Sequence, residues 1–498
     1  MKILALAVRR AARESLSPDW NLADRVASLT TADDLALLGE VNDEDGEPKP
    51  ILLVKADPDG EQRLKEALDD IVWIEEGIPH HPQIGGRGGF NAGFQIDVVN
   101  TNGDRLRDCR VTVFTESDEG KLSPEVNGRT DWNGSYEAAV HPADRIKQII
   151  VNPIDGHWSA VAFGAASRVV CLPIEYPADR LGWWHRSLGF EAISADQGAG
   201  VKIGVIDQGC GQHAALQHVQ RIGTFGQNAY DPEDSDDSNH GTHVCGIVSA
   251  IPKGDVGFWG IAPGAELYVA AISGTHYQWD IANALRTLVR KHGVDLVNIS
   301  LGARTRSNIL VEAILDAQER GCLCLAAAGN ESGPVLWPAN FESVVAVSAV
   351  GSRWGVPAGT FAAGRIPDAI DAESQSAEFA LAHFSCKGPE INCCGPGVGI
   401  VSTRSEPFDE EGGWWDMSGT SMASPAVCAT LAVGLSRSEE FADLPRDASR
   451  NSFIRKVLEE MCESVGLVPH HQGLGMPRVD SSDARPPDGA GDHRGEVR

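Results

Sequence analysis

The chain has 498 residues, a formal net charge of −28 and 11 cysteines. This length allows two or three domains, and the acidic excess disfavours nucleic acid and anionic membranes as partners. An odd number of cysteines without framework spacing argues against a disulfide-stapled secreted protein.

The N-terminal residues do not have the pattern of an export signal. The apolar run that starts at Met1 is interrupted by Arg9 and Arg10, whereas a secretory signal has a longer apolar core followed by small residues at a cleavage site. No later run has the roughly 18–20 apolar residues that a membrane helix needs. We therefore expect a soluble cytoplasmic protein in a reducing compartment, with no membrane partner.

The first 80 residues alternate between short strand and helix patterns. The hydrophobic periodicity and turn residues predict elements in the order strand, helix, strand, strand, helix, strand, at residues 3–8, 22–29, 35–41, 51–56, 61–68 and 71–75. This β-α-β-β-α-β order is typical of a ferredoxin-like α+β domain. We place that domain at residues 1–82.

A second pattern follows a glycine-rich linker at residues 83–89. Alternating apolar residues predict strands at 94–98, 110–114, 134–137 and 149–151, with turns at Asn102-Gly103, Asp131 and Asn133-Gly134. These short strands predict a small antiparallel β-sandwich at residues 90–168. It contains no catalytic constellation, so a protein-interaction or spacer role is the hypothesis for it.

Two polar residues then stand at the ends of the first elements of a longer α/β region, one at the end of a strand and one at the beginning of a helix. The apolar run at residues 201–206 predicts a buried strand that ends in Asp207, and open α/β sheets place their sites at such carboxyl ends. The segment that starts at His240 and contains His243 predicts a helix with a histidine at its beginning.

The third feature is a serine, Ser421, placed between small residues just before an apolar run. The preceding Gly419 and Thr420 allow a tight turn, so Ser421 falls in the first turn of a helix. Unpaired backbone N–H groups and the positive end of the helix dipole stabilise negative charge there. Taken alone, this pattern is more often that of a simple helix N-cap.

The order Asp…His…Ser is the order of subtilisin-type triads, and the three motifs resemble the subtilisin-like (subtilase) serine peptidase family. Segments at Gly260-Ile261-Ala262-Pro263 and Trp337-Pro338-Ala339 also stand where subtilases carry similar ones. The resemblance covers residues 181–480. It implies a three-layer α/β domain with a mainly parallel sheet, and a serine endopeptidase whose triad is Asp207, His240 and Ser421.

The resemblance also assigns residues around the triad. It implies that Asn330 is the oxyanion-hole asparagine and that the strand end at Ser300, Leu301 and Gly302 pairs with extended substrate. Ala327 and Gly329 would wall the primary pocket, with the Trp337 region beside them, which suggests a broad or apolar preference. Protein or peptide substrates are implied. No cofactor is required, and calcium is an optional ion, for which the acidic run at residues 231–237 is one candidate and a solvated loop is the alternative. The loop at 251–255 contains Lys253, which does not invite a cation.

Two further resemblances concern the N-terminal half. Residues 69–76 resemble the last strand of subtilase propeptides, which implies that the first domain is an intramolecular inhibitor with its tail at 77–82, either self-processed or left in place. An unrelated small α/β module is the alternative. The stretch from Thr130 to Tyr136 resembles the carboxypeptidase-regulatory-like (transthyretin-like) sandwich.

Other function classes remain to be separated by experiment. A zinc enzyme is disfavoured because neither the His240/His243 spacing nor the pairs Cys322/Cys324 and Cys393/Cys394 match zinc-ligand patterns. We interpret the cysteines as small buried apolar residues. The alternative is a thiol-sensitive site, since a bulky mercurial bound at Cys245 would displace His240. A dedicated maturation protease and a catalytically silent scaffold are the alternatives to a general peptidase. The composition of residues 481–498 predicts a disordered tail.

Overall fold

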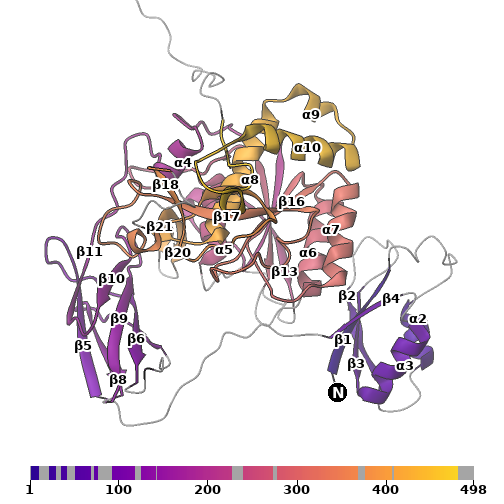
Figure 1. Ribbon diagram of the computed structural model, residues 1–498, viewed down its shortest axis with the longest axis horizontal. Coiled ribbons are helices and arrows are strands. Elements are labelled where there is room, and N and C mark those ends of the chain that lie inside the picture. The colour runs from indigo at the N-terminus through magenta and orange to yellow at the C-terminus, as the bar shows by residue number, and fades with distance from the viewer. Residues whose placement is uncertain are drawn as a thin grey trace, which may run out of the picture.

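The computed structural model contains three units, an N-terminal α+β unit, a β-sandwich and a large α/β domain (Figure 1). The structure describes residues 2–9, 22–29, 35–41, 51–68, 72–76, 92–117, 120, 125–141, 143–226, 239–272, 278–367, 376–406 and 409–479. The expected propeptide tail at 77–82, the linker at 83–89, the acidic run at 231–237 and the C-terminal tail at 481–498 lie outside these residues.

The N-terminal unit is a four-stranded sheet with two helices. Its strands, in the spatial order β2-β3-β1-β4 with antiparallel neighbours, are β1 (Lys2–Val8), β2 (Leu35–Val41), β3 (Ile51–Ala56) and β4 (Val72–Glu76). The helices are α2 (Leu22–Leu29) and α3 (Pro58–Leu68). Helix α3 begins three residues before the expected start at Glu61, because Asp57 Oδ1 accepts the N–H groups of Asp59 (3.1 Å) and Gly60 (3.0 Å) and so caps the first turn.

Strand β1 buries both of its faces. Leu4 and Leu6 lie in the unit's own core with residues of α2 and α3, as expected for alternate residues of a strand. Ala5 and Ala7 point the other way and belong to an apolar cluster of the large domain that contains residues of α6 (Gln278–Lys291) and α7 (Asn308–Glu319). The small side chains on this face allow the sheet to approach these helices closely.

The β-sandwich has a four-stranded sheet, β10-β9-β6-β7, and a three-stranded sheet, β11-β5-β8, packed around one apolar core. Its strands are β5 (Ala92–Asn100), β6 (Arg110–Glu116), β7 (Val126–Arg129), β8 (Ser135–Val140), β9 (Arg145–Asn152), β10 (Ala160–Phe163) and β11 (Arg168–Cys171). The four strands predicted from sequence pair antiparallel as expected, β5 with β8 and β6 with β9, but β11, which was not predicted, pairs with β5 in parallel. The chain changes sheet after β10 and enters beside β5 in the same direction, which an alternating apolar pattern cannot reveal.

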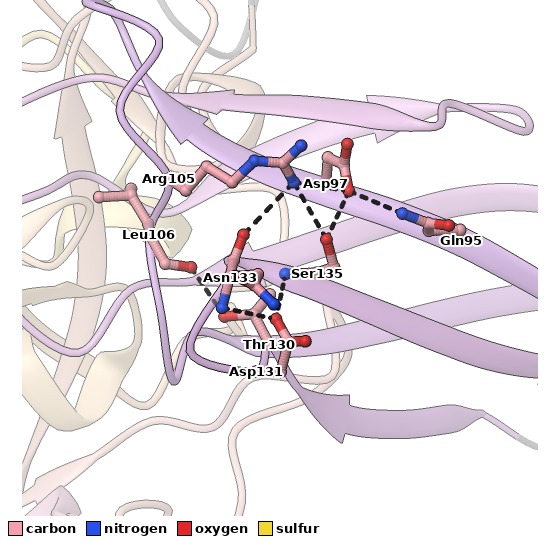
Figure 2. Close-up of polar contacts among 8 residues, drawn as sticks. All are labelled: Gln95, Asp97, Arg105, Leu106, Thr130, Asp131, Asn133 and Ser135. Atoms are coloured by element: carbon pink, nitrogen blue, oxygen red, sulfur yellow. Dashed lines mark hydrogen bonds and ion pairs between the residues drawn. The ribbon is translucent and has the colours of Figure 1, made fainter.

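A polar network closes one end of the sandwich (Figure 2). Asp131 Oδ1 accepts the N–H groups of Asn133 and Ser135, both at 2.9 Å, which forms the turn before β8. Ser135 Oγ donates to Asp97 Oδ1 at 2.7 Å, and Arg105 lies 3.0 Å from the same oxygen. The Ser135 hydroxyl, followed by Arg105, lowers the pKa of Asp97 to about 2. The network joins β5 to the turn and has no nucleophile–base pair.

The large domain is built on an eight-stranded sheet in the order β13-β14-β12-β15-β16-β17-β18, with β19 also paired to β17. The pairs are parallel except β17–β18, which confirms the expected mainly parallel sheet. The strands are β12 (Lys202–Asp207), β13 (Gln220–Phe225), β14 (Glu266–Ile272), β15 (Leu296–Ile299), β16 (Leu323–Ala327), β17 (Val344–Ser352), β18 (Phe379–Leu381) and β19 (Ile391–Pro396).

Helices cover both faces of this sheet and make three layers (Figure 1). One face packs on α5 (His240–Ser249), α8 (Thr420–Ser436) and α10 (Ala448–Met461), and the other on α6 and α7. Alternate strand residues divide between the two cores, as Leu325 does on one side and Ala326 on the other. The smaller elements are α4 (Trp183–Ser187), α9 (Glu439–Asp443), α11 (Pro469–Gln472), β22 (Cys462–Glu463), β23 (Met476–Pro477) and a hairpin of β20 (Ile400–Glu406) and β21 (Asp409–Met417).

Candidate active site

Asp207, His240 and Ser421 each lie at the end of a regular element. Asp207 is the last residue of β12, His240 is the first residue of α5, and Ser421 lies in the first turn of α8. Parallel strands end at one edge of the sheet, and the helices that follow begin there. The fold therefore brings together three residues that are 33 and 181 positions apart in the chain.

The aspartate and the histidine are in direct contact. Asp207 Oδ1 lies 2.7 Å from His240 Nδ1, with the carboxylate fully buried and the imidazole 21% exposed. The backbone N–H of Gln208 donates to the same oxygen at 2.7 Å. Because an ionised carboxylate can only accept hydrogen bonds, Nδ1 carries the proton and Nε2 is left as the basic nitrogen.

Ser421 is held at the end of β15. Its hydroxyl donates to the backbone oxygen of Ser300 at 3.4 Å, and Ser300 Oγ donates to the backbone oxygen of Ser421 at 3.0 Å. Behind them, Asn298 Nδ2 donates to Ser300 Oγ at 2.9 Å and Ser424 Oγ donates to Asn298 Oδ1 at 2.6 Å. This buried chain of hydrogen bonds fixes the first turn of α8 against the sheet.

Asn330 is oriented by the residue before the serine. Its Oδ1 accepts both the N–H and the hydroxyl of Thr420, each at 2.9 Å. Since the amide oxygen is engaged in this way, the NH₂ group is the end of the side chain that remains to donate toward the cleft. Thr420 Oγ1 in turn accepts the N–H of Gly329 at 3.1 Å, which ties the loop of Asn330 to the start of α8.

A cavity of about 290 Å³ collects the residues that the sequence singled out. It is lined by Gln208, His240, Ser300, Leu301, Gly302, Ala327, Gly329, Asn330, Glu331, Leu336, Thr420 and Ser421. All the expected substrate-binding residues are among them, and Asp207 lies buried behind His240. Trp337, which we expected beside the pocket, is 3% exposed, and the neighbouring Leu336 lines the cavity instead.

Sequence reasoning missed four lining residues, Gln208, Glu331, Leu336 and Thr420. Gln208, Glu331 and Thr420 each directly adjoin a residue that was identified, so adjacency was the available signal. Leu336 lies in an irregular segment without a periodic pattern. Glu331 also forms an exposed ion pair with Arg304, whose Nη2 lies 2.7 Å from Glu331 Oε2, so a cation accompanies the one carboxylate among these lining residues.

The comparisons with known proteins agree with this geometry. The family model described as the subtilase family matches residues 198–475, more than half of the chain. The chain belongs to the subtilase family. It is therefore placed among the subtilisin-like serine proteases, which are hydrolases.

Individual relatives and a solved structure are also similar to this chain. The minor extracellular protease Epr of Bacillus subtilis is 33% identical over 240 residues, which cover 47% of this chain but only 32% of Epr. Subtilisin DY of Bacillus licheniformis is 30% identical over 265 residues, which cover 50% of this chain and 84% of that protein. The solved structure of sphericase aligns with 60% of this chain and 99% of its own, at 25% identity and a TM-score of 0.47.

The surroundings of the cysteines and of His243 in this subtilase indicate structural roles. All 11 cysteines are free, and ten of them are buried, which confirms their interpretation as apolar packing residues. Burial raises the pKa of Cys109 to about 11 and that of Cys428 further. His243 is buried, and its Nε2 contacts the backbone oxygen of Ile400 at 2.9 Å. Within the described part of the chain, no group of three or more His, Cys, Asp or Glu residues is arranged to hold a metal ion.

The loop at residues 251–255 does not suit calcium. Lys253 Nζ donates to Gln217 Oε1 at 2.7 Å, and Arg180 donates to the backbone oxygen of Gly254. Two protein cations already occupy this loop, so a divalent ion would meet charge repulsion there. Across the described residues, no helix combines the length and apolarity needed to span a membrane.

Proposed function

We propose that the protein is a serine endopeptidase that hydrolyses peptide bonds through Asp207, His240 and Ser421. The observation that carries the proposal is the 2.7 Å contact between Asp207 and His240 behind a cleft that His240 and Ser421 both line. A serine alone is not a nucleophile at neutral pH; it becomes one when a base, itself oriented by a third group, accepts its proton.

The reaction follows from these positions. His240 Nε2 takes the proton of Ser421 as its oxygen attacks the substrate carbonyl carbon, and then gives that proton to the leaving amine nitrogen as the C–N bond breaks. Water repeats the sequence on the acyl-enzyme: His240 takes a proton from water as the water oxygen adds to the ester carbon, and then gives that proton to the Ser421 oxygen as the ester C–O bond breaks and the acid is released. Asp207 keeps the imidazole in the required tautomer and stabilises its protonated form.

The charge that develops on the substrate oxygen would meet two donors. These are the Ser421 backbone N–H, at the positive end of α8, and the Asn330 side-chain NH₂. Donors held in place before the reaction stabilise the transition state without reorganising, and removal of one such donor costs about 10²–10³ in turnover. Thr420 supports this role by engaging the opposite end of the Asn330 amide.

Substrates would bind as an extended strand along Ser300, Leu301 and Gly302, where the chain leaves β15 and becomes exposed at Gly302. Ala327, Gly329 and Leu336 give the adjoining pocket apolar walls, and the ion pair of Arg304 with Glu331 offsets its negative charge. These features favour a broad or apolar preference at the residue before the cleaved bond.

We propose that the N-terminal ferredoxin-like unit, residues 1–82, is a propeptide-like inhibitor of the same chain. Ala5 and Ala7 share an apolar cluster with α6 and α7, and Trp73 Nε1 donates to Glu312 Oε1 of α7 at 3.3 Å. With the unit docked in this way, the expected inhibitory tail would continue from the C-terminal end of β4. Whether the tail is cut or stays in place determines whether the inhibition is temporary or permanent.

The sandwich at residues 90–168 is proposed to be a transthyretin-like module, supported by its two sheets and the turn at Asp131. The 11 free cysteines, ten of them buried, favour a reducing compartment, and we propose the cytoplasm as the location. The proposed mechanism uses only side-chain and backbone groups of the chain and requires no cofactor. Calcium would serve stability only, and a thermal unfolding temperature that is equal in calcium and in a chelator would exclude it.

Mass spectrometry and hydrolysis together test the proposed function. Purified wild-type protein is expected to cleave a casein substrate and to lose about 80 N-terminal residues if the first domain is self-processed, whereas Ser421→Ala should do neither. Intact chains in both proteins would argue against self-processing. Equal hydrolysis by both would reject Ser421 as the nucleophile. Profiling on a peptide library then separates a broad peptidase from one dedicated to a single precursor.

A further inference from the structure

The hairpin of β20 and β21 connects the two catalytic helices. On the β20 side, Ser405 donates through both its N–H and its hydroxyl to Asn239 Oδ1, each at 2.7 Å, directly before His240. Thr403 Oγ1 donates to the backbone oxygen of Thr242 at 2.7 Å, in the first turn of α5. On the other strand, β21 ends at Met417, only four residues before Ser421.

This hairpin is contacted by the sandwich loop between β9 and β10, residues 152–159. The loop projects out of the sandwich, since its Trp158 lies in the main core of the large domain, and we call it the exit segment. Arg404 Nη1 donates to the backbone oxygen of Pro153 at 3.1 Å. The N–H of Trp414 donates to Asp155 Oδ1 at 2.9 Å, and the backbone oxygen of Trp414 accepts the N–H of Gly156 at 3.1 Å. The exit segment therefore contacts both strands of the hairpin.

Asp416 is the innermost point of this contact. Its side chain is buried at 4% exposure, and its Oδ1 accepts the N–H of Ser159 at 2.7 Å. Ser159 is itself buried, and its hydroxyl accepts a hydrogen bond from Asn152 Nδ2 at 2.9 Å. Burial raises the pKa of Asp416 and the Ser159 groups oppose that rise. Because a buried carboxyl group loses its hydration, it needs these hydrogen-bond partners to offset the cost of burial.

Trp158 supports the nucleophile from a second direction. Its ring lies 3.2 Å from the position that a Cβ on Gly399 would take, and it is 7% exposed in the main core. The N–H of Gly399 donates to Ser418 Oγ at 2.9 Å, and the N–H of Gly419 donates to the backbone oxygen of Gly397 at 2.8 Å. The turn under Trp158 thus holds the residues just before Ser421.

We propose that the exit segment of the β-sandwich is a positioning element of the active site, and that Asp416 is a positioning residue for Ser421. The inference rests on the proposed peptidase function. Asp416 binds the exit segment, and this contact fixes the position of β21 and therefore of Ser421. The paired strand β20 fixes the position of His240 in the same way. The sandwich is therefore part of the catalytic unit, besides any interaction that its surface makes.

The test compares Asp416→Ala with Asp416→Asn in the full chain. Each protein is brought to the same processed form, active sites are counted with a fluorophosphonate, and kcat and KM are measured on one fluorogenic peptide. A displacement of about 1 Å at a reacting group can cost roughly 10²-fold in rate, so Asp416→Ala should lower kcat by about 10- to 100-fold. KM should stay within about twofold, because residues 300–302 are not touched. Asp416→Asn keeps the acceptor for the Ser159 N–H and should stay within about threefold of wild type.

Asp97→Asn is the matched control, since it disturbs a carboxylate network in the same sandwich whose side-chain partners, Gln95, Ser135 and Arg105, belong neither to the hairpin nor to the exit segment (Figure 2). It should leave kcat unchanged. Equal kcat for Asp416→Ala and wild type would overturn the proposal, and so would equal losses in the Ala and Asn variants. If Asp416→Ala does not fold, Asp155→Ala decides: this exposed residue should lower kcat about 3- to 10-fold, and no loss would reject the proposal. Failure of the wild type to label at Ser421 would instead reject the peptidase function itself.

Discussion

The N-terminal unit and the β-sandwich are attached to the same α/β domain by different means. The N-terminal sheet presents the small residues Ala5 and Ala7 to α6 and α7 and adds a hydrogen bond from Trp73 to Glu312. The sandwich sends its exit segment into the domain, where Trp158 enters the main core and Ser159 binds Asp416. Both interfaces are buried, but the second involves the hairpin that connects the helices of His240 and Ser421.

This difference separates a docked unit from an integrated one. A flat apolar contact can dissociate after a cut, because each side keeps its own core. Removal of the exit segment would instead leave Asp416 and the backbone groups of Trp414 buried without partners, which costs more than a lost contact. The N-terminal unit therefore suits a removable inhibitor, and the sandwich suits a permanent part of the enzyme.

The largest expected effect is on the integrated interface. Trp158→Ala should lower the free energy of unfolding by about 3–5 kcal/mol, the usual cost of deleting a buried aromatic side chain. Trp132→Ala, at an 83% exposed tryptophan of the same sandwich, should change it by less than about 0.5 kcal/mol. Denaturant unfolding measures both values. Similar values for the two variants would contradict an integrated sandwich.

The next effect lies in the chemistry and leaves both interfaces alone. Asn330→Ala should lower kcat by about 10²–10³, the loss known for an oxyanion-hole asparagine in subtilisin itself, because the developing charge loses one donor. Steady-state kinetics with titrated active sites measures it. Asn330→Asp is the companion variant: it keeps the acceptor for Thr420 but removes the donor, so a wild-type rate in that variant would show that donation is not the role.

A smaller effect is expected at the docked interface. Trp73→Ala should raise the activity of the cut chain at least about tenfold at a fixed low concentration, because tryptophans at interfaces commonly contribute 2 kcal/mol or more and the inhibitor would dissociate sooner. Activity is followed on dilution, after the proteins have been cut to the same extent. Trp132→Ala serves again as the tryptophan control, and a response equal to that of Trp73→Ala would remove the docking argument.

Acid should lower the stability of the region where the sandwich joins the α/β domain. Burial lowers the pKa of His185 to about 3 and that of His213 to about 4, and His213 Nε2 contacts the Gly413 backbone oxygen of the hairpin. Both rings are neutral in the fold, so their contribution is complete above the unfolded pKa of about 6.5 and is lost as pH falls from there toward 3–4. Unfolding measured between pH 7.5 and 5 should show this loss. His213→Gln should reduce the slope, and an unchanged slope would exclude His213 as a source.

The smallest expected effect concerns the ion pair beside the cleft. Arg304→Ala should raise kcat/KM for lysine over leucine before the cleaved bond by about 3- to 5-fold, since an exposed pair contributes at most about 1 kcal/mol. The reason is that Glu331 would then attract the substrate cation. Peptide pairs that differ at this one residue measure the ratio. The double variant Arg304→Ala, Glu331→Gln should lose the gain, and a gain that persists would exclude Glu331 as its source.

The sequence allowed the proposed catalytic residues to be located because each has a local signal. Asp207 ends an apolar strand, His240 begins a helix, and Ser421 follows a glycine before an apolar run. The fold then assembles them without further information, because strand ends and helix starts meet at one edge of the sheet. The order of the N-terminal elements was predictable for the same reason, since each has its own periodicity.

The contacts between units were not predictable. Ser159 and Asp416 are 257 positions apart, and Trp73 and Glu312 are 239 apart; neither pair stands out from its neighbours in sequence. The parallel pairing of β11 with β5 also left no trace, because alternation reports which face is buried and not the direction of the strand. Leu336 lines the cleft from an irregular segment, where no period indicates which side chain turns inward.

The most direct test of the central claim is to map a fluorophosphonate adduct by mass spectrometry. The full chain is labelled before and after a cut introduced within residues 83–89 by an added protease site, with Ser421→Ala alongside. We predict an adduct on Ser421 in the wild type, formed faster after the cut, and none in the variant. A wild-type protein that carries no adduct on Ser421 in either form, while remaining folded, would contradict the assignment of Ser421 as the nucleophile.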